Sequence, residues 1–547
     1  MKKYIFPLIL LLAFILRVFG LGNHPTGFTP DEASFGYDAY SILKTGKDQW
    51  GKPFPLTLRS FGDSKLPLYT YLTIPSVAVF GLNEFSTRLA SALVGILAVF
   101  STYLMVKVLF KDERLALFSS FLLAISPWHI ALSRGAFEAN LTVFFMSAGV
   151  WAFLSEKYIL SSILFGLNIF SYHSARLVTP LIILALVFIN KEKFNLKKNV
   201  VSILIFGVFL SIAVWQVLHG GSSRAADVTI FNPTDKWMSV YDKRYEAVFD
   251  GMPNNIAKIF SNKITYLFDQ ITNSYSTYLS PQFLFTLGPA ESTYGMLTGH
   301  GVLYLFEAFF IISGLWYFAN NGWKDKKLLF ILFWILVSIV PASLTKGPGY
   351  AGNRAAIMMP AIEILSAFGG LVLFDFLSSK FTKRKITLLY SFLILVSGIF
   401  FIEEYLYRQS RDGAEGMLYG RRQMMNTINK IEGNYKTIQI SRSLSEPQAY
   451  VAFFSPIDPK IHQEASADWM RYEAEKKSFL DQLGEYSLGK FVFKNISFNE
   501  DSKVPGVLLV GKPSEFADKI TPLEVIKYKN QIPAIVIYDP AKDVKSN

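Results

Sequence analysis

The chain has 547 residues, of which 51% are hydrophobic and 16% aromatic, and only 18% are charged. Soluble domains carry roughly 25% charged residues, so the composition excludes an ordinary soluble protein, and the lack of cysteine excludes disulfides and thiolate metal sites. The formal net charge of +12 lies mostly in short loops between apolar segments, and no nucleic-acid-binding module is recognisable, so membrane topology and anionic lipid explain the charge better than nucleic acid.

Eleven apolar segments recur along the chain, as is typical of membrane-spanning helices. They cover approximately residues 4–21, 87–110, 115–132, 137–154, 158–172, 177–190, 199–218, 301–319, 328–345, 354–377 and 385–403. The first lacks a small-residue cleavage site, so we expect an uncleaved signal-anchor helix. The predicted fold is a polytopic α-helical membrane domain of about eleven transmembrane helices over residues 1–403, followed by a small α/β domain over 404–547.

Short basic loops separate these segments and fall on one side of the membrane if all eleven span. The clusters are Lys2-Lys3, 111–114, 191–198, 324–327 and 380–385. The positive-inside rule assigns that side to the cytoplasm. We therefore expect a multi-pass plasma-membrane protein with a cytoplasmic N-terminus. The first outer loop (22–86), a large outer loop (219–300) and the C-terminal domain would lie outside.

The outer segments contain predicted structure of their own. Residues 30–44 and 66–80 have the pattern of amphipathic helices that lie in the membrane interface and are too short to span. A further helix is predicted near 253–275. In the tail we expect a helix over 417–432 and strands at 436–441, 449–455, 490–494, 506–511 and 533–538.

Thr29-Pro30-Asp31-Glu32 marks the start of the first interfacial helix. Thr29 suits the N-cap, Pro30 the first helical position, and Glu32 completes a capping box. Capping alone explains Glu32, and the helix dipole favours an ionised Asp31. The alternative is functional: Asp31 is a catalytic base held at the membrane surface, with Glu32 in a secondary, substrate-binding role.

Other ionisable and aromatic side chains lie at the outer ends of the segments, where charge beside apolar sequence indicates a functional site by default. The candidates are Lys65, Tyr69, His129, Arg134, Glu138, Tyr172, Arg176, Arg224 and Arg354. Asp31 and Glu138 suit general-base chemistry or metal binding. The cationic side chains suit a phosphate-bearing ligand, and the aromatic rings suit a lipid tail or a sugar.

Each candidate also has a purely structural explanation. Arg134 and Arg176 can snorkel at helix ends, and Glu138 can pair with Arg134 at i, i+4. No second histidine near His129 supports a metal, so a packed interfacial histidine is the simpler interpretation. The tyrosines can belong to an aromatic belt. Basic residues gathered on the outer side nevertheless oppose the positive-inside bias, which favours a ligand site there.

Several of these motifs resemble the GT-C glycosyltransferases, and within them the protein mannosyltransferase-like group that includes bacterial aminoarabinose transferases. The resemblance covers the N-terminal two thirds of the chain. It is carried by Asp31-Glu32 behind the first segment, Lys65-Leu66-Pro67-Leu68-Tyr69, Ser126-Pro127-Trp128-His129, Tyr172-His173-Ser174-Ala175-Arg176 and Ser280-Pro281-Gln282.

The resemblance implies an enzyme that takes a sugar from a polyprenyl-phosphate carrier at the outer membrane face. It implies that Asp31 is the catalytic acidic residue, that Lys65 contacts the lipid-linked phosphate, and that Glu138 is a second acidic residue. Aminoarabinose transferases tend to have Glu directly before that Lys, whereas this chain has Ser64. This departure leaves the identity of the sugar open.

The expected reaction is a single displacement with inversion. Asp31 would act as base, and Lys65 with Arg176 or Arg354 would stabilise the leaving phosphate. The acceptor is an undefined lipid, glycan or protein. No cofactor is required, although a divalent metal is compatible with the three outer carboxylates.

Other functions are open for such a chain. They are an oligosaccharyl- or wall-polymer transferase, a lipid-linked-sugar flippase or transporter, and a noncatalytic lipid-binding scaffold. Transporters typically have charges near the midplane and repeated halves. Here the charges gather at one face and no repeat is visible, which disfavours transport.

Overall fold

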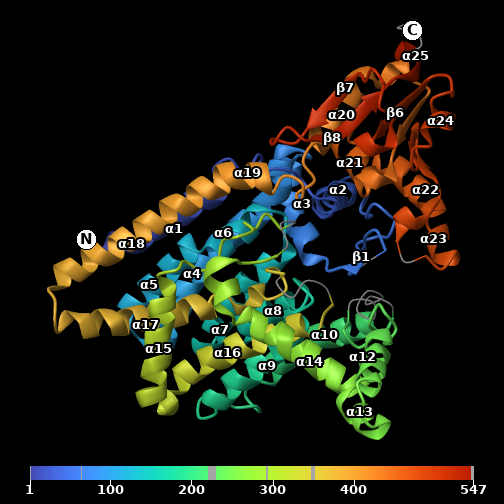
Figure 1. The fold of residues 1–547 in the computed structure, drawn as a ribbon. Helices are drawn as coiled ribbons and strands as arrows, with labels where there is room; N and C mark the ends of the chain where they lie inside the picture. The colour runs from blue at the N-terminus through green and yellow to red at the C-terminus, as the bar shows by residue number, and fades with distance from the viewer. Residues whose placement is uncertain are drawn as a thin grey trace.

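The computed structural model describes residues 2–62, 64–219, 229–290, 294–346, 351–477 and 479–543. A helical body carries the N-terminal three quarters of the chain, and an α/β domain sits at one end of it, against the first outer loop (Figure 1). The apolar cores follow this division. One large cluster lies among the helices, and a second joins the α/β domain to the first outer loop.

A helix lies within each of the eleven apolar segments. These helices are α1 (Lys2–Val18), α4 (Glu84–Phe110), α5 (Glu113–Ile125), α6 (Pro127–Arg134), α7 (Leu141–Leu154), α8 (Tyr158–Asn168), α9 (Ala175–Ile189), α10 (Val200–Leu218), α15 (Glu307–Asn321), α16 (Lys326–Ser343), α17 (Ala361–Ser378) and α18 (Lys383–Glu403). Helices α5 and α6 share one segment and are bent by 55°. Pro127 explains the break, because proline disfavours helical backbone in the residue before it.

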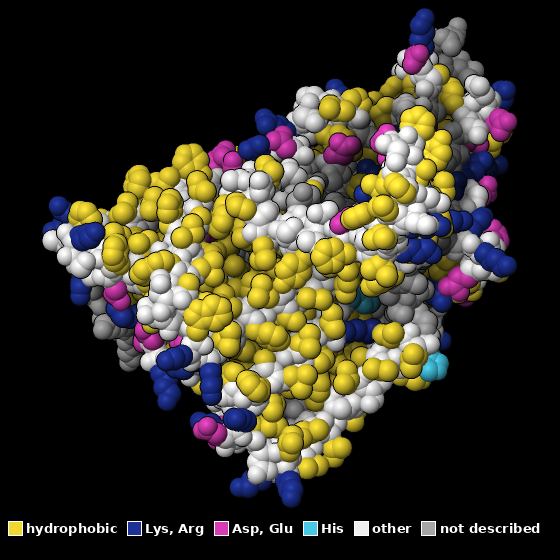
Figure 2. Space-filling view, turned by 60° about the horizontal axis from the view of Figure 1, so that its bottom comes forward, with side chains coloured by type: hydrophobic (Ala, Val, Ile, Leu, Met, Phe, Trp, Pro, Cys, Tyr) yellow, Lys and Arg dark blue, Asp and Glu magenta, His cyan; other side chains and the backbone are white. Residues whose placement is uncertain are grey.

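Five helices in the described part of the chain are long and apolar enough to cross a membrane, or six if the bent pair α5–α6 is one span. Large apolar side chains are exposed on α9, α10, α15 and α18, and hydrophobic surface dominates the face of the helical body in Figure 2. This exposure suits contact with lipid. The chain is a mostly helical, multi-pass membrane protein.

Close helix packing is visible where α17 crosses α15. A Cβ atom added at Gly369 would lie 1.8 Å from the carbonyl oxygen of Phe310 and 2.6 Å from the amide nitrogen of Gly314. Only glycine permits this approach of two backbones. Small residues at such crossings are typical of helix packing in membranes, where van der Waals contact drives association.

The two helices predicted in the first outer loop are present as α2 (Pro30–Thr45) and α3 (Leu68–Phe80). Between them, β1 (Leu58–Arg59) and β2 (Ser64–Lys65) pair antiparallel, with Leu58 opposite Lys65. This short ribbon fixes the position of Lys65 relative to α2. The loop is therefore a structured platform on the helical body.

The large outer loop (219–300) differs from its prediction. The helix expected at 253–275 is two helices, α13 (Asn254–Phe260) and α14 (Lys263–Tyr278), because Asn262 caps a new helix with its own capping box. An earlier helix, α12 (Met238–Phe249), was not predicted. Its single buried residue is Val240, so it lacks the apolar stripe by which a packed helix is detected. A π-helical turn, η2 (Gln282–Thr286), follows.

The C-terminal domain contains a six-stranded sheet in the order β4-β5-β3-β6-β8-β7. Its strands are β3 (Thr437–Ile440), β4 (Tyr486–Leu488), β5 (Phe491–Phe493), β6 (Val507–Gly511), β7 (Glu524–Lys527) and β8 (Pro533–Tyr538). Strand β3 is parallel to β5 and β6, and the remaining pairs are antiparallel. The sheet confirms a small α/β domain and four of the five predicted strands; β4 and β7 were missed.

The strand predicted at 449–455 is wrong, because these residues lie mostly in helix α21 (Pro447–Phe454). Pro447 occupies a first-turn position, where proline favours a helix start. The helix is buried from Pro447 to Phe453, and a short, wholly buried apolar run has no periodicity that separates helix from strand. Helix α20 (Arg421–Ile431) lies within the predicted 417–432. The remaining helices are α22 (Pro459–Trp469), α23 (Arg471–Ala474), α24 (Phe498–Asp501) and α25 (Pro540–Asp543).

Helix α18 continues through η5 (Glu404–Arg408) and α19 (Gln409–Asp412) into the C-terminal domain, which docks on α2 through α21. Tyr450 donates a hydrogen bond to the carbonyl of Phe28, with an O···O distance of 3.0 Å. The ring of Phe453 lies 4.8 Å from that of Phe28, and a Cβ at Gly36 would lie 2.6 Å from Phe453 Cε2. The tail therefore packs tightly against the helix that carries Asp31.

Candidate active site

The first turn of α2 carries Asp31, near the end of the helical body on which the C-terminal domain docks. Thr29 is the N-cap: its Oγ1 accepts from the Glu32 amide at 3.3 Å, and Glu32 Oε2 accepts from the Thr29 amide at 3.1 Å. The predicted capping box is therefore present. Lys65 Nζ lies 2.7 Å from Asp31 Oδ1. The Asp31 side chain is 51% exposed and that of Lys65 is 7% exposed, so an accessible carboxylate is held by a buried ammonium group.

The Lys65 ammonium group has mainly aromatic surroundings. Its Nζ lies 4.4 Å from the ring centroid of Phe35 and 5.5 Å from that of Phe61, distances at which a cation is attracted by a ring face. Within the described residues, Nζ makes no hydrogen bond besides its ion pair with Asp31. An ammonium group has three donors. The Lys65 Nζ is itself buried, and the remaining donors have no protein acceptor among the described residues.

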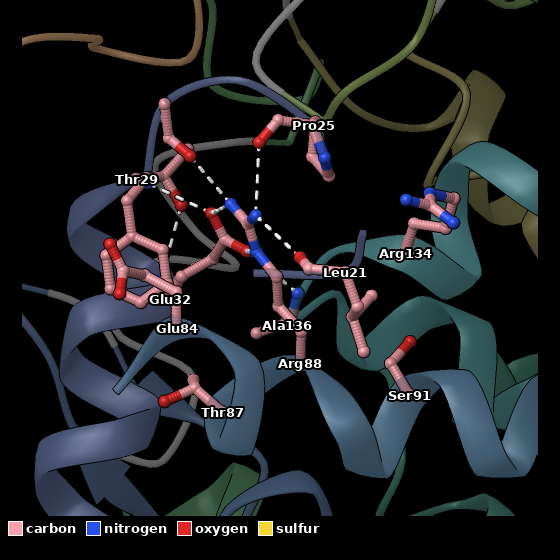
Figure 3. A network of polar contacts seen from close by, with 12 residues as sticks. Leu21, Pro25, Thr29, Glu32, Glu84, Thr87, Arg88, Ser91, Arg134 and Ala136 are labelled. Carbon is pink, nitrogen blue, oxygen red and sulfur yellow. Dashed lines mark hydrogen bonds and ion pairs between the residues drawn. The ribbon is translucent and has the colours of Figure 1, made fainter. Parts of the chain in front are cut away.

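Glu32 has a different environment, at the centre of a buried polar network (Figure 3). Its Oε1 lies 2.8 Å from Arg88 Nε and accepts from the Ala136 amide at 3.0 Å. Its Oε2 accepts from Arg88 Nη2 at 3.1 Å, and both side chains are fully buried. Arg88 also donates to the carbonyls of Leu21, Pro25 and Gly27. The carboxylate of Glu32 is occupied by protein donors, and the network fixes the loop that leads into α2.

Arg88 was missed in the sequence analysis, although a signal was present. It lies at the outer end of the segment predicted at 87–110, where an ionised side chain is costly unless it is paired. The capping motif accounts for Glu32 from local sequence alone and gives no indication of a distant partner. Its partner comes from α4, 56 residues further along the chain.

Arg134 and His129 both contact the end of α1. Arg134 donates to the carbonyls of Leu16 and Phe19 at 2.7 Å each. His129 is fully buried, and its Nδ1 lies 2.8 Å from Arg17 Nη2. These contacts support the structural explanation, in which the two residues anchor α1 to α6.

Tyr69 is buried, and its hydroxyl donates to the Thr87 carbonyl at 2.8 Å. Its ring centroid lies 4.9 Å from that of Phe35, beneath Lys65. The contacts of Tyr69 therefore support the platform that carries the Asp31–Lys65 pair.

Glu138 begins the short helix η1 (Glu138–Asn140) and is partly exposed. The Tyr172 hydroxyl accepts from Asn353 Nδ2 at 3.1 Å, which ties the turn before α9 to the turn before η4 (Ala356–Met358). Helices η1 and η4 are in contact. Glu138 and Tyr172 therefore lie in turns that converge on the same part of the fold.

The remaining cations bind other groups. Arg176 Nη2 donates to Gln216 Oε1 at 2.5 Å, and Gln216 in turn donates to the Leu56 carbonyl. Arg354 donates to Thr345 Oγ1 at 3.0 Å and to the Lys346 carbonyl at 2.5 Å. Arg224 lies outside the described residues. Among the predicted site residues that the structure describes, Asp31 and Lys65 form an ion pair with each other.

A second pair of carboxyl groups lies in the first outer loop. Asp38 is two turns beyond Asp31 on α2, and its oxygens accept from the Gln49 amide and side chain at 3.0 Å each. Burial and the nearby Asp48 carboxylate raise the pKa of Asp38 above its ordinary range. These buried carboxyls stabilise the loop conformation. Across the described residues, no group of three His, Asp or Glu side chains is arranged to hold a metal.

Comparison with known proteins supports the resemblance found in the sequence. Residues 64–217 match the dolichyl-phosphate-mannose-protein mannosyltransferase family. A stretch of 141 residues is 33% identical to undecaprenyl phosphate-alpha-4-amino-4-deoxy-L-arabinose arabinosyl transferase 1 of Pseudomonas fluorescens. That match spans 26% of this chain and only 24% of the relative.

Solved structures extend the likeness of fold to almost the whole chain. ArnT from Cupriavidus metallidurans bound to undecaprenyl phosphate aligns with a TM-score of 0.55 at 12% identity, over 97% of each chain. Its apo state aligns with a TM-score of 0.50 over the same shares. The chain therefore has the GT-C fold seen in ArnT, and its sequence matches the mannosyltransferase family across residues 64–217.

Proposed function

We propose that this chain is a membrane glycosyltransferase that transfers a sugar from a polyprenyl-phosphate carrier to an acceptor at the extracytoplasmic face. The observation that carries the proposal is the pair of Asp31 and Lys65, an exposed carboxylate 2.7 Å from a buried ammonium group. The relatives support the donor class, since one is an undecaprenyl-phosphate-sugar transferase and ArnT binds undecaprenyl phosphate.

The two side chains divide the chemistry between them. In their ion pair the charges of Asp31 and Lys65 neutralise each other. A donor phosphate beside Lys65 would take over the ammonium donors, and Asp31 would then be free to accept a proton. The first-turn position of Asp31 favours its ionised form, because the helix N-terminus carries partial positive charge.

In the proposed reaction the acceptor hydroxyl or amine attacks the anomeric carbon as Asp31 removes its proton. The bond from that carbon to the phosphate oxygen breaks, and polyprenyl phosphate leaves from the opposite face of the sugar, which gives inversion. Lys65 stabilises the negative charge that develops on the leaving phosphate. Electrostatic stabilisation of this kind is most effective when the charged group is already in place and water is excluded.

A groove lined by apolar side chains supports a position for the polyprenyl tail. A cavity of about 480 Å³ lies between α1, α5, α6 and α18 and is lined almost entirely by apolar side chains. Its lining includes Leu12, Leu16, Phe121, Ile130, Ile394 and Ile402. We place the tail in this groove, along α18.

The proposed topology uses all eleven helical segments as spans, with α5 and α6 as one bent span. Five of the other segments contain helices of fewer than 18 residues, namely α1, α7, α8, α9 and α15. With the N-terminus in the cytoplasm, α2, α3 and the C-terminal domain lie outside. Asp31 and Lys65 then meet the donor at the outer face.

Replacing Lys65 tests this assignment. Lys65→Ala is expected to lower the transfer rate by about 10²–10³-fold, because a preorganised group that stabilises developing charge is lost. The measurement is the initial rate of label transfer by purified protein in lipid nanodiscs. The donors are radiolabelled polyprenyl-phosphate mannose and polyprenyl-phosphate 4-amino-pentose, with a cell-envelope extract as acceptor source.

Lys52→Ala is the matched control, because Lys52 is an exposed lysine of the same loop. It should transfer at the wild-type rate. A folded Lys65→Ala protein as fast as the Lys52→Ala protein would contradict the phosphate-binding role.

A further inference from the structure

Glu446, at the start of α21 in the C-terminal domain, has an unusual backbone. Its φ is 49°, and that of the preceding Ser445 is 58°. Residues with a side chain rarely adopt this left-handed conformation. Such strain persists only where the surrounding structure enforces it, and it clusters at ligand sites. Two consecutive strained residues therefore mark the turn before α21 as a candidate binding element.

The carboxyl group of Glu446 is buried and oriented by a short relay. The residue is 8% exposed. Gln448 Nε2 donates to Glu446 Oε2 at 2.6 Å, and Tyr486 donates to Gln448 Oε1 at 2.7 Å. Within the described residues, Oε1 of Glu446 accepts no hydrogen bond. A buried carboxyl that is held on one oxygen and open on the other can bind a hydrogen-bond donor of a ligand.

This carboxyl lies near the candidate active site, because its helix packs on the helix that carries Asp31. Helix α21 packs on α2, and Tyr450, one turn beyond Glu446, bonds to Phe28, three residues before Asp31. Burial raises the pKa of Glu446 to about 8, and the charges of Asp31 and Lys65 are close enough to act on it in opposite directions. The other groups that face it are Asp481, Tyr450 and Tyr486.

We propose that Glu446 is a substrate-binding residue that the C-terminal domain contributes to the active site, where its carboxyl group binds a hydroxyl or ammonium group of the donor sugar. The inference rests on the proposed function. A ligand phosphate at Lys65 places the attached sugar next to it, and Glu446 is within electrostatic reach of that lysine. The C-terminal domain therefore takes part in choosing the sugar.

The ionisation of Glu446 connects this role to pH. Because burial raises its pKa to about 8, the Glu446 carboxyl group is mostly protonated at pH 7. A neutral carboxyl both donates to and accepts from a sugar hydroxyl. An ammonium group on the sugar would instead favour the carboxylate, and its binding would release the proton of Glu446.

The test compares Glu446→Gln and Glu446→Ala in the full-length protein, with the same two radiolabelled donors. Asp501→Asn is the matched control, because Asp501 is a buried carboxylate of the same domain whose partners, Gln439 and Lys494, lie within that domain. We expect Glu446→Ala to raise the donor KM by at least about tenfold and to lower kcat less, as loss of a ground-state contact does. Asp501→Asn should leave the donor KM unchanged.

The glutamine variant keeps the shape of the side chain and removes its ionisation. The pH profile of kcat/KM should show an inflection near pH 8 in the wild type that is absent from Glu446→Gln. If Glu446→Gln raises the KM of the 4-amino-pentose donor alone, the group that Glu446 binds is an ammonium group. If it raises the KM of both donors equally, that group is a hydroxyl. Wild-type donor KM and pH profile in both variants would overturn this inference, whereas absence of transfer by the wild type would overturn the proposed function itself.

Discussion

Replacing Asp31 by asparagine is expected to lower the rate of sugar transfer by about 10²–10⁴-fold, the usual contribution of a general base. Asparagine keeps the size of the side chain and cannot take the acceptor proton. The donor KM should stay the same or fall, because Lys65 loses the carboxylate that competes with the donor phosphate. The measurement is transfer rate and donor KM, alongside thermal unfolding.

The fold should survive this change, since the Asp31 side chain is 51% exposed and ion pairs of exposed groups contribute little to stability. Glu473→Gln provides the control: it removes a carboxylate of similar exposure, which lies on α23 of the C-terminal domain and is paired with Arg59 of β1. Near-normal turnover by a well-folded Asp31→Asn protein would rule out Asp31 as the base.

The largest effect on stability is expected from the buried pair of Glu32 and Arg88. Arg88→Met leaves the Glu32 carboxylate buried without its cationic partner and leaves three loop carbonyls without their donor. Removal of one partner of a buried ion pair typically costs about 3–5 kcal/mol. The measurement is the unfolding midpoint of purified protein in a mild detergent.

A second substitution separates lost charge from lost packing. Glu32→Gln combined with Arg88→Met should be less destabilising than the sum of the two single changes, since neither charge is then left unpaired. The exposed pair of Lys107 and Glu113 is the control, and Lys107→Met should leave the midpoint unchanged. An unfolding midpoint of Arg88→Met equal to that of the wild type would refute the structural role of the network.

Local signals were sufficient to predict most helices and the start of α2. Apolar run length located the eleven helical segments, and the pattern Thr29-Pro30-x-Glu32 located the helix N-terminus with its capping box. The bend at Pro127 was not predicted, and the residues of helix α21 were predicted as a strand. Run length is insensitive to the first, which has a local cause in Pro127 itself, and a short, wholly buried apolar run does not distinguish the helix from a strand.

The candidate site shows the same division between local and long-range information. Asp31 and Lys65 are 34 positions apart, and nothing in their spacing implies a contact. The residue types suggested a base and a phosphate-binding cation, the family resemblance assigned these roles to Asp31 and Lys65, and the structure shows the contact itself. Glu32 was correctly identified as a cap, but its bond to Arg88 needed the packing of α4 on the first outer loop. Glu446 comes near the Asp31–Lys65 pair only because the C-terminal domain docks on α2, and no local sequence pattern indicates that docking.

The most direct test of the central claim follows a radiolabelled sugar on its polyprenyl phosphate, with purified wild-type protein in sealed vesicles. A glycosyltransferase should move the label from the lipid to the acceptor and form one polyprenyl phosphate for each sugar transferred, and Asp31→Asn should do neither. Label that crosses the vesicle membrane while still attached to its lipid, with no polyprenyl phosphate formed, would contradict the account and identify a transporter.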